Sequence, residues 1–112
     1  MSHESFRHYH LEKLKDKEEA RLFLEIALEE YEKDGDTQIF LRALKDVTNA
    51  QGGLSALAEK STLNRQNLYK VMSGKSRPRL ETVSQIIHSL GFRLALKPIN
   101  STKNEIITSS IV

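Results

Sequence analysis

The 112-residue sequence contains no cysteine, so disulfide bonds and thiolate chemistry are excluded and a reducing, cytoplasmic setting is expected. No apolar run approaches the ~20 residues of a membrane span, and the N-terminus lacks the layout of a signal peptide. A phosphate-binding glycine loop is missing, as are paired carboxylates beside a histidine in apolar surroundings. We therefore expect no enzyme, no small-molecule substrate, no cofactor and no metal site.

Charge is distributed unevenly along the chain, although the net charge is only +2. Residues 1–36 hold 11 acids and 6 bases, a net −5, whereas residues 37–112 hold 11 bases and 4 acids, a net +7. Within residues 54–79 a single acid, Glu59, accompanies six bases: Lys60, Arg65, Lys70, Lys75, Arg77 and Arg79. This separation suggests two partners of opposite charge, and a basic patch of this kind is typical of nucleic-acid binding.

Apolar spacing predicts a mainly α fold of five helices. Four of them are expected over residues 17–33, 37–50, 65–72 and 80–90, with a further short helix capped by Ser55. Asp16 and Asn64 are placed to cap the helices that follow them, and Gly74 to end the helix over 65–72. On the last helix, Leu80, Val83, Ile87 and Leu90 share the apolar register.

The flanking segments lack a helical period. Residues 1–15 are expected to form a loosely ordered arm, residues 16–98 the helical domain, and residues 99–112 a polar tail. Within the domain, residues 92–97 alternate apolar and other side chains, which predicts a short half-buried β-strand. Because one strand cannot satisfy its own edges, its mate could be the same strand of a second subunit, a partner protein's sheet, or residues 105–112.

Residues 54–73 show the pattern of a helix-turn-helix. Two short helices are joined by about three residues, with the small Ala58 where they meet. Apolar side chains fill the seam between them: Leu57, Leu63, Leu68 and Val71. This packing turns the N-terminal half of the second helix outward, where a DNA major groove could receive it.

The polar side chains of this segment suit DNA. Arginine can pair bidentately with guanine, and glutamine or asparagine with adenine, so the predicted base-reading residues are Asn64, Arg65, Gln66 and Asn67. Hydroxyl and cationic side chains can contact phosphates, and the predicted phosphate contacts are Ser55, Tyr69, Lys70, Lys75, Arg77 and Arg79. The alternative is a polar helix on an ordinary bundle surface.

The layout also resembles a known family. Residues 51–96 resemble the lambda-repressor-like (XRE) helix-turn-helix class. With the upstream acidic helix and the stretches "LYKVMSG" and "LGFRLAL", residues 16–98 are similar to HigA-like probable addiction module antidote proteins. Two positions depart from that family: Thr62 replaces a usual glycine in the turn, and Arg79 a usual Ser or Thr cap. We interpret Arg79 as a phosphate contact, because helix N-termini favour anions.

The resemblance implies a type II antitoxin that is not an enzyme. Such a protein neutralises a RelE/ParE-type toxin, which cleaves mRNA, and represses its own palindromic operator as a homodimer. We expect Phe92, Leu94 and Leu96 to form part of the dimer contact, and residues 1–36 to supply much of the toxin interface. Two alternatives remain: a phage-type or metabolic repressor without a toxin, and a protein-binding module whose helix-turn-helix has lost DNA affinity.

Overall fold

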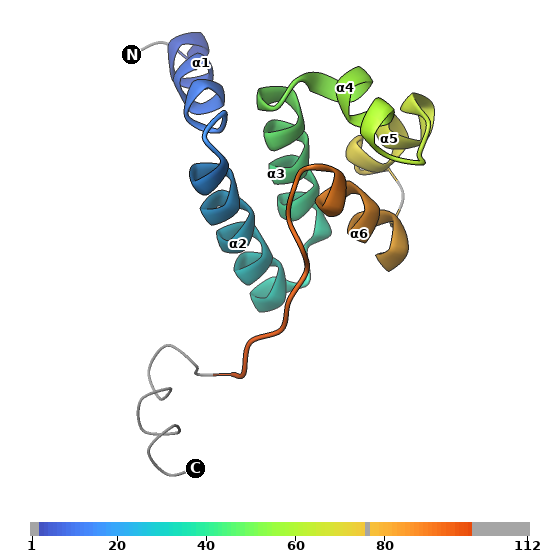
Figure 1. Ribbon diagram of the computed structural model, residues 1–112. Coiled ribbons are helices and arrows are strands. Elements are labelled where there is room, and N and C mark those ends of the chain that lie inside the picture. Colours follow the sequence, from blue (N-terminus) through green and yellow to red (C-terminus); the bar gives the residue numbers. More distant parts are fainter. Residues whose placement is uncertain (1–2, 76, 100–112) are drawn as a thin grey trace.

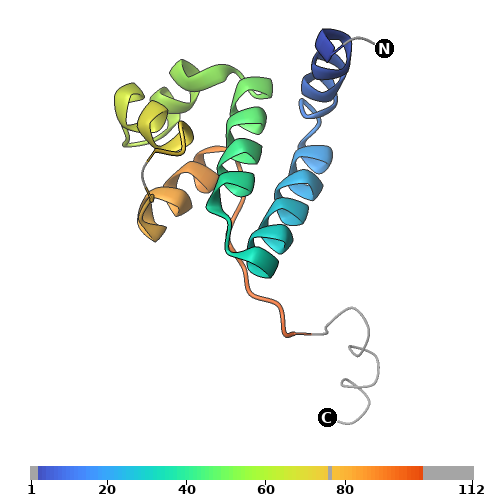
Figure 2. The ribbon, with the colours of Figure 1, turned by 180° about the vertical axis from the view of Figure 1, so that it is seen from behind.

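Six helices make up the part of the chain that the computed structural model describes, residues 3–75 and 77–99 (Figure 1). They are α1 (His3–Lys13), α2 (Lys17–Asp34), α3 (Thr37–Ala50), α4 (Gly53–Lys60), α5 (Arg65–Met72) and α6 (Leu80–Ser89). Helix α3 lies in the middle, with α1 and α2 on one side and α4, α5 and α6 on the other, as both views show (Figures 1 and 2). None of these helices combines the length and apolar character needed to cross a bilayer.

Side-chain caps set the limits of α2 and α3. The Asp16 carboxylate accepts hydrogen bonds from the backbone N–H groups of Glu18 and Glu19, at 2.8 and 3.1 Å. Gly35 ends α2 at φ 72°, a left-handed conformation that glycine adopts without the Cβ clash of other residues. Asp36 then caps α3, because its Oδ1 accepts a hydrogen bond from the backbone N–H of Gln38 at 2.9 Å. The predicted limits of both helices are confirmed to within one residue.

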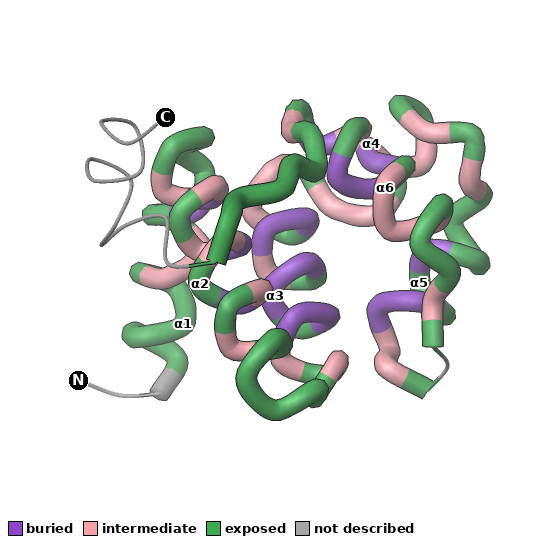
Figure 3. Tube along the Cα trace, turned by 90° about the horizontal axis from the view of Figure 1, so that it is seen from below, coloured by how far each residue is buried: buried purple, intermediate pink, exposed green. Residues whose placement is uncertain are grey.

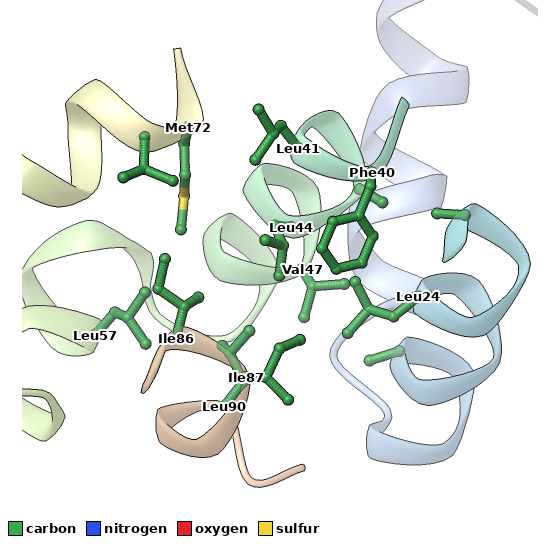
Figure 4. Close-up of a cluster of buried hydrophobic side chains, with 14 of the residues drawn as sticks. Leu24, Phe40, Leu41, Leu44, Val47, Leu57, Met72, Ile86, Ile87 and Leu90 are labelled. Atoms are coloured by element: carbon green, nitrogen blue, oxygen red, sulfur yellow. The ribbon is translucent and has the colours of Figure 1, made fainter. Parts of the chain in front are cut away.

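The hydrophobic core surrounds α3 (Figure 4). Leu44 and Val47 on α3 are fully buried, and they meet apolar side chains from α2, α4, α5 and α6, including Leu24, Leu57, Leu68, Ile86 and Leu90. Burial of each leucine- or isoleucine-sized side chain contributes about 1.5–3 kcal/mol, so this cluster joins the helices into one core. This cluster holds α4 and α5 in a fixed position beside α3.

The buried face of α6 differs in part from its predicted register. Ile86, which the sequence analysis did not place inside, is fully buried, and Ile87 and Leu90 are buried as predicted. Leu80 was predicted to share this face, but it lies in the first turn and is 75% exposed. Leu80 therefore stands clear of the core, whereas Val83 in the same turn is partly buried against it.

The N-terminal segment is helical, in contrast to the loose arm expected for residues 1–15. Helix α1 docks on α3 through Asp46, whose carboxylate lies 3.2 Å from Arg7 Nη2 and 3.3 Å from His10 Nε2. Leu14 follows the helix and is buried, and its carbonyl accepts a hydrogen bond from Gln51 Nε2 at 2.8 Å. These long-range contacts attach α1 to the domain.

The prediction of a β-strand at residues 92–97 is wrong, since no strand occurs among the described residues. Side chains of α2 hold the segment instead: Lys17 Nζ lies 5.4 Å from the centre of the Phe92 ring, and Lys97 Nζ lies 3.2 Å from Glu25 Oε1. A strand needs a paired neighbour, and this segment contacts a helix. Residues 105–112, one suggested mate, lie outside the described residues.

Candidate nucleic-acid interface

Helices α4 and α5 form where the helix-turn-helix was predicted, joined by residues 61–64. In the turn, Ser61 Oγ accepts a hydrogen bond from the Leu63 N–H at 3.2 Å. Asn64 caps α5, because its Oδ1 accepts the Asn67 N–H at 2.7 Å. Leu57 on α4 and Leu68 on α5 are buried between the helices and α3. The buried side of α5 fixes which of its side chains face outward.

The predicted cap of α4 is wrong. The helix begins at Gly53, two residues before Ser55, and its N-cap residue is Gly52 at φ 118° with no side-chain cap bond. The glycine pair therefore forms the entry to α4. Ser55 lies inside the first turn of α4 and is exposed, so its hydroxyl remains accessible.

The outward side of α5 carries the predicted base-reading residues. Arg65, Gln66 and Asn67 are all exposed, as are Tyr69 and Lys70 on the following turn. Within the described chain, the side chains of Arg65, Gln66 and Lys70 make no hydrogen bond or ion pair. Asn64 differs from them, because its amide oxygen is engaged in the cap. The structure therefore presents a row of hydrogen-bond donors that the fold itself does not use.

A basic loop follows α5 and leads into α6. Gly74 ends the helix at φ 77°, as predicted, and its carbonyl accepts a hydrogen bond from Gln38 Nε2 on α3 at 2.8 Å. Lys75 and Arg77 in this loop are exposed and form no ion pair with any described residue. The Gln38 bond joins residues 36 positions apart, and no local sequence signal could have revealed it. It anchors the start of the basic loop beside α5.

Arg79 occupies the N-cap position of α6 and makes no side-chain cap bond. Its Nη1 lies 3.8 Å from Glu81 Oε1, and both side chains are largely exposed. An exposed ion pair at this distance contributes little, about 0–1 kcal/mol, so the guanidinium remains accessible to other anions. The predicted phosphate contacts on α5, in the loop and at the start of α6 are all exposed: Tyr69, Lys70, Lys75, Arg77 and Arg79.

The predicted dimer residues differ in burial. Phe92 is partly buried, packing against the core beneath Lys17. Leu94 is 36% exposed, and Leu96 is fully exposed. Only the two leucines therefore remain available for a contact with another molecule.

Over the residues that the structure describes, the chain is an all-helical domain. Two of its short helices, α4 and α5, present an exposed polar and basic side. Residues 5–98 match the family of probable addiction module antidote proteins, and the chain belongs to this family. The match includes nearly all of α1, beyond the residues 16–98 on which the resemblance was based. Family membership suggests an antitoxin role.

A relative from Haemophilus influenzae, an uncharacterized protein, is 29% identical over 86 residues. The aligned segment covers 77% of this chain and 84% of the relative. No solved structure matches the chain.

Proposed function

We propose that the chain is the antitoxin of a type II toxin–antitoxin module. It neutralises a RelE/ParE-type mRNA-cleaving toxin and represses its own operator by binding duplex DNA as a homodimer. Membership of an antidote family supports the antitoxin role. The observation that carries DNA binding is the outward side of α5 with the adjoining basic loop, where polar and cationic side chains have no partner in the described fold.

The roles of these side chains follow from their chemistry. Arg65 can donate two hydrogen bonds to guanine O6 and N7, and Gln66 and Asn67 can pair with adenine N6 and N7. Lys70, Lys75 and Arg77 neutralise phosphates, which positions α5 in the groove without reading sequence. Ser55, Tyr69 and Arg79 extend the same phosphate contact on either side. Asn64 mainly caps the N-terminus of α5, and its free amide nitrogen donates a hydrogen bond to a base.

Dimerisation would place two copies of α5 on a palindromic operator. Half-sites about one helical turn apart match a protein with two-fold symmetry. Exposed Leu94 and Leu96 support a contact between copies through residues 92–97, because solvent-exposed leucines in neighbouring positions gain from burial. The contact is made by side chains of this segment, which lies against α2.

The experiment is co-expression with the protein encoded by the reading frame that adjoins this chain's gene. Expression of that protein alone should arrest growth, and co-expression of the wild-type chain should restore it. A Lys75→Ala/Arg77→Ala variant should restore growth equally well but should fail to repress a reporter behind the chain's own promoter. Repression by a wild-type chain that restores no growth would contradict the antitoxin role and leave a repressor without a toxin.

A further inference from the structure

Two aliphatic side chains on α2 are exposed on the side opposite the core. Leu22 and Ile26 are 42% and 58% exposed, whereas Leu24 and Ala27 on the same helix are buried. Residues four apart are neighbours on a helix surface, so Leu22 and Ile26 form one apolar stripe. Single exposed leucines are ordinary, but neighbouring ones that the fold does not use indicate a contact surface.

A shallow groove extends this stripe toward α3. It has a volume of about 260 Å³ and is lined by five apolar side chains of α2 and α3, Phe23, Ile26, Ala27, Ile39 and Ala43, together with the charged Glu30, Arg42 and Asp46. Ala27 and Ala43 on its lining are buried, and the Phe23 ring meets the His10 ring edge-on at 4.8 Å between centroids. A recess of this kind beside exposed aliphatic groups can receive an apolar anchor side chain from a partner.

Carboxylates surround the stripe. Glu18 and Glu25 both bind Arg21, and the hydrogen bond from Arg21 holds the pKa of the Glu18 carboxyl below its ordinary value. Glu30 pairs with Lys33 at 3.6 Å, while Glu29 forms no ion pair with any described residue. Glu25 also pairs with Lys97 at 3.2 Å. Over its whole length α2 carries seven acids and three bases, a net charge of −4, and Glu29 is an exposed carboxylate on it.

From this geometry we infer that the outward face of α2, centred on Leu22 and Ile26, is the docking surface for the toxin. The inference rests on the proposed antitoxin function. A protein that cleaves mRNA must hold a polyanion and therefore carries a cationic surface, which complements this acidic face. An apolar side chain of the toxin enters the groove between α2 and α3. Covering the cationic surface in this way excludes RNA from it.

The position of this surface leaves the DNA side open. Figure 3 shows α1 and α2 on one side of α3, and α5 and α6 on the other. A toxin on the outward face of α2 is therefore separated from α5 by the core of the domain. The free chain and the toxin-bound chain can both present α5 to an operator.

The test compares the wild-type chain with a Leu22→Gln/Ile26→Gln variant, using the purified product of the adjoining reading frame. Glutamine is a good helix former, so α2 persists, which circular dichroism and operator binding verify. We expect toxin affinity to fall at least about 30-fold, as for loss of interface hot spots. The matched control is Leu80→Gln on α6, an exposed leucine that does not line the groove, and it should change affinity by no more than about twofold.

A second variant tests the contribution of charge to toxin binding. Glu29→Lys should slow toxin association several-fold at low ionic strength, and the difference should shrink as salt screens the charges. Glu81→Lys, an exposed carboxylate on α6, is the control and should leave the association rate unchanged.

The outcomes separate the two proposals. If the wild-type chain neither binds the toxin nor relieves growth arrest, the antitoxin function fails and the docking surface with it. If the wild-type chain binds and the α2 variants bind as tightly and as fast, the antitoxin function stands and the docking surface is overturned. A loss of affinity confined to Leu80→Gln would likewise overturn it by placing the toxin at the start of α6.

Discussion

Arg79 places a cation at the N-terminus of α6. A cation at the N-terminus of a helix opposes the helix dipole and is disfavoured by about 0.3–1 kcal/mol. Its side chain supplies no cap bond, and its ion pair with Glu81 is long and exposed. A DNA phosphate at this position would reverse the sign of the interaction, because helix N-termini bind anions.

Arg79→Ser should therefore change stability and DNA affinity in opposite directions. Serine is a good N-cap residue, so the free energy of unfolding should rise by about 0.5–1 kcal/mol in urea denaturation. Operator affinity should fall, because one phosphate contact is lost. A variant that gains stability and binds DNA as tightly as the wild type would show that Arg79 contacts no phosphate.

Local residue chemistry was predictable, and long-range pairing was not. The cap bonds of Asp16 and Asn64 form as predicted, since each depends only on residues two or three positions away. The Asp46 contacts with α1 and the Gln38 bond to Gly74 join residues 36 to 39 positions apart. A hydrogen bond over such a separation depends on the tertiary arrangement, which periodicity alone does not determine.

At the scale of elements, strong apolar periodicity determined what could be predicted. Helices α2, α3, α5 and α6 lie within about one residue of their expected limits, because each has a clear buried stripe. Helix α1 was missed: its exposed side includes Phe6 and Tyr9, and it is held largely by polar contacts and by Leu14 beyond its end. The alternation of residues 92–97 suggested a strand, but the segment has no paired neighbour in the described chain.

The segment over residues 92–97 carries the prediction about assembly. Leu94→Ser/Leu96→Ser should convert a dimer to a monomer in light scattering, because the proposed contact loses its exposed apolar groups. Operator binding should weaken strongly in parallel, since two half-sites then no longer act together. Leu22→Gln, on the outward face of α2, is the control and should remain dimeric. An unchanged dimer in the double variant would assign the contact to another surface.

At the scale of the whole molecule, charge is sorted by the two sides of α3. Helix α2, which carries seven acids and three bases, lies on one side of α3, and α5 lies on the other (Figure 3). The net −5 of residues 1–36 and the net +7 of the remainder correspond to this arrangement. Complementary charge speeds association with each partner and disfavours the wrong one, so a cationic protein and a nucleic acid can bind the same chain at separate surfaces.

The most direct test of the DNA interface is binding of the full chain to its promoter duplex and to a random duplex, measured by fluorescence anisotropy over a range of salt concentrations. Lys75→Ala and Arg77→Ala should each weaken binding to both duplexes equally and reduce the salt slope by about 1. Gln66→Ala should cost about 1–3 kcal/mol on the promoter duplex and little on the random one. Equal losses on both duplexes for Lys75→Ala and Gln66→Ala alike would contradict the assignment of α5 to base reading and of the loop to phosphate contact.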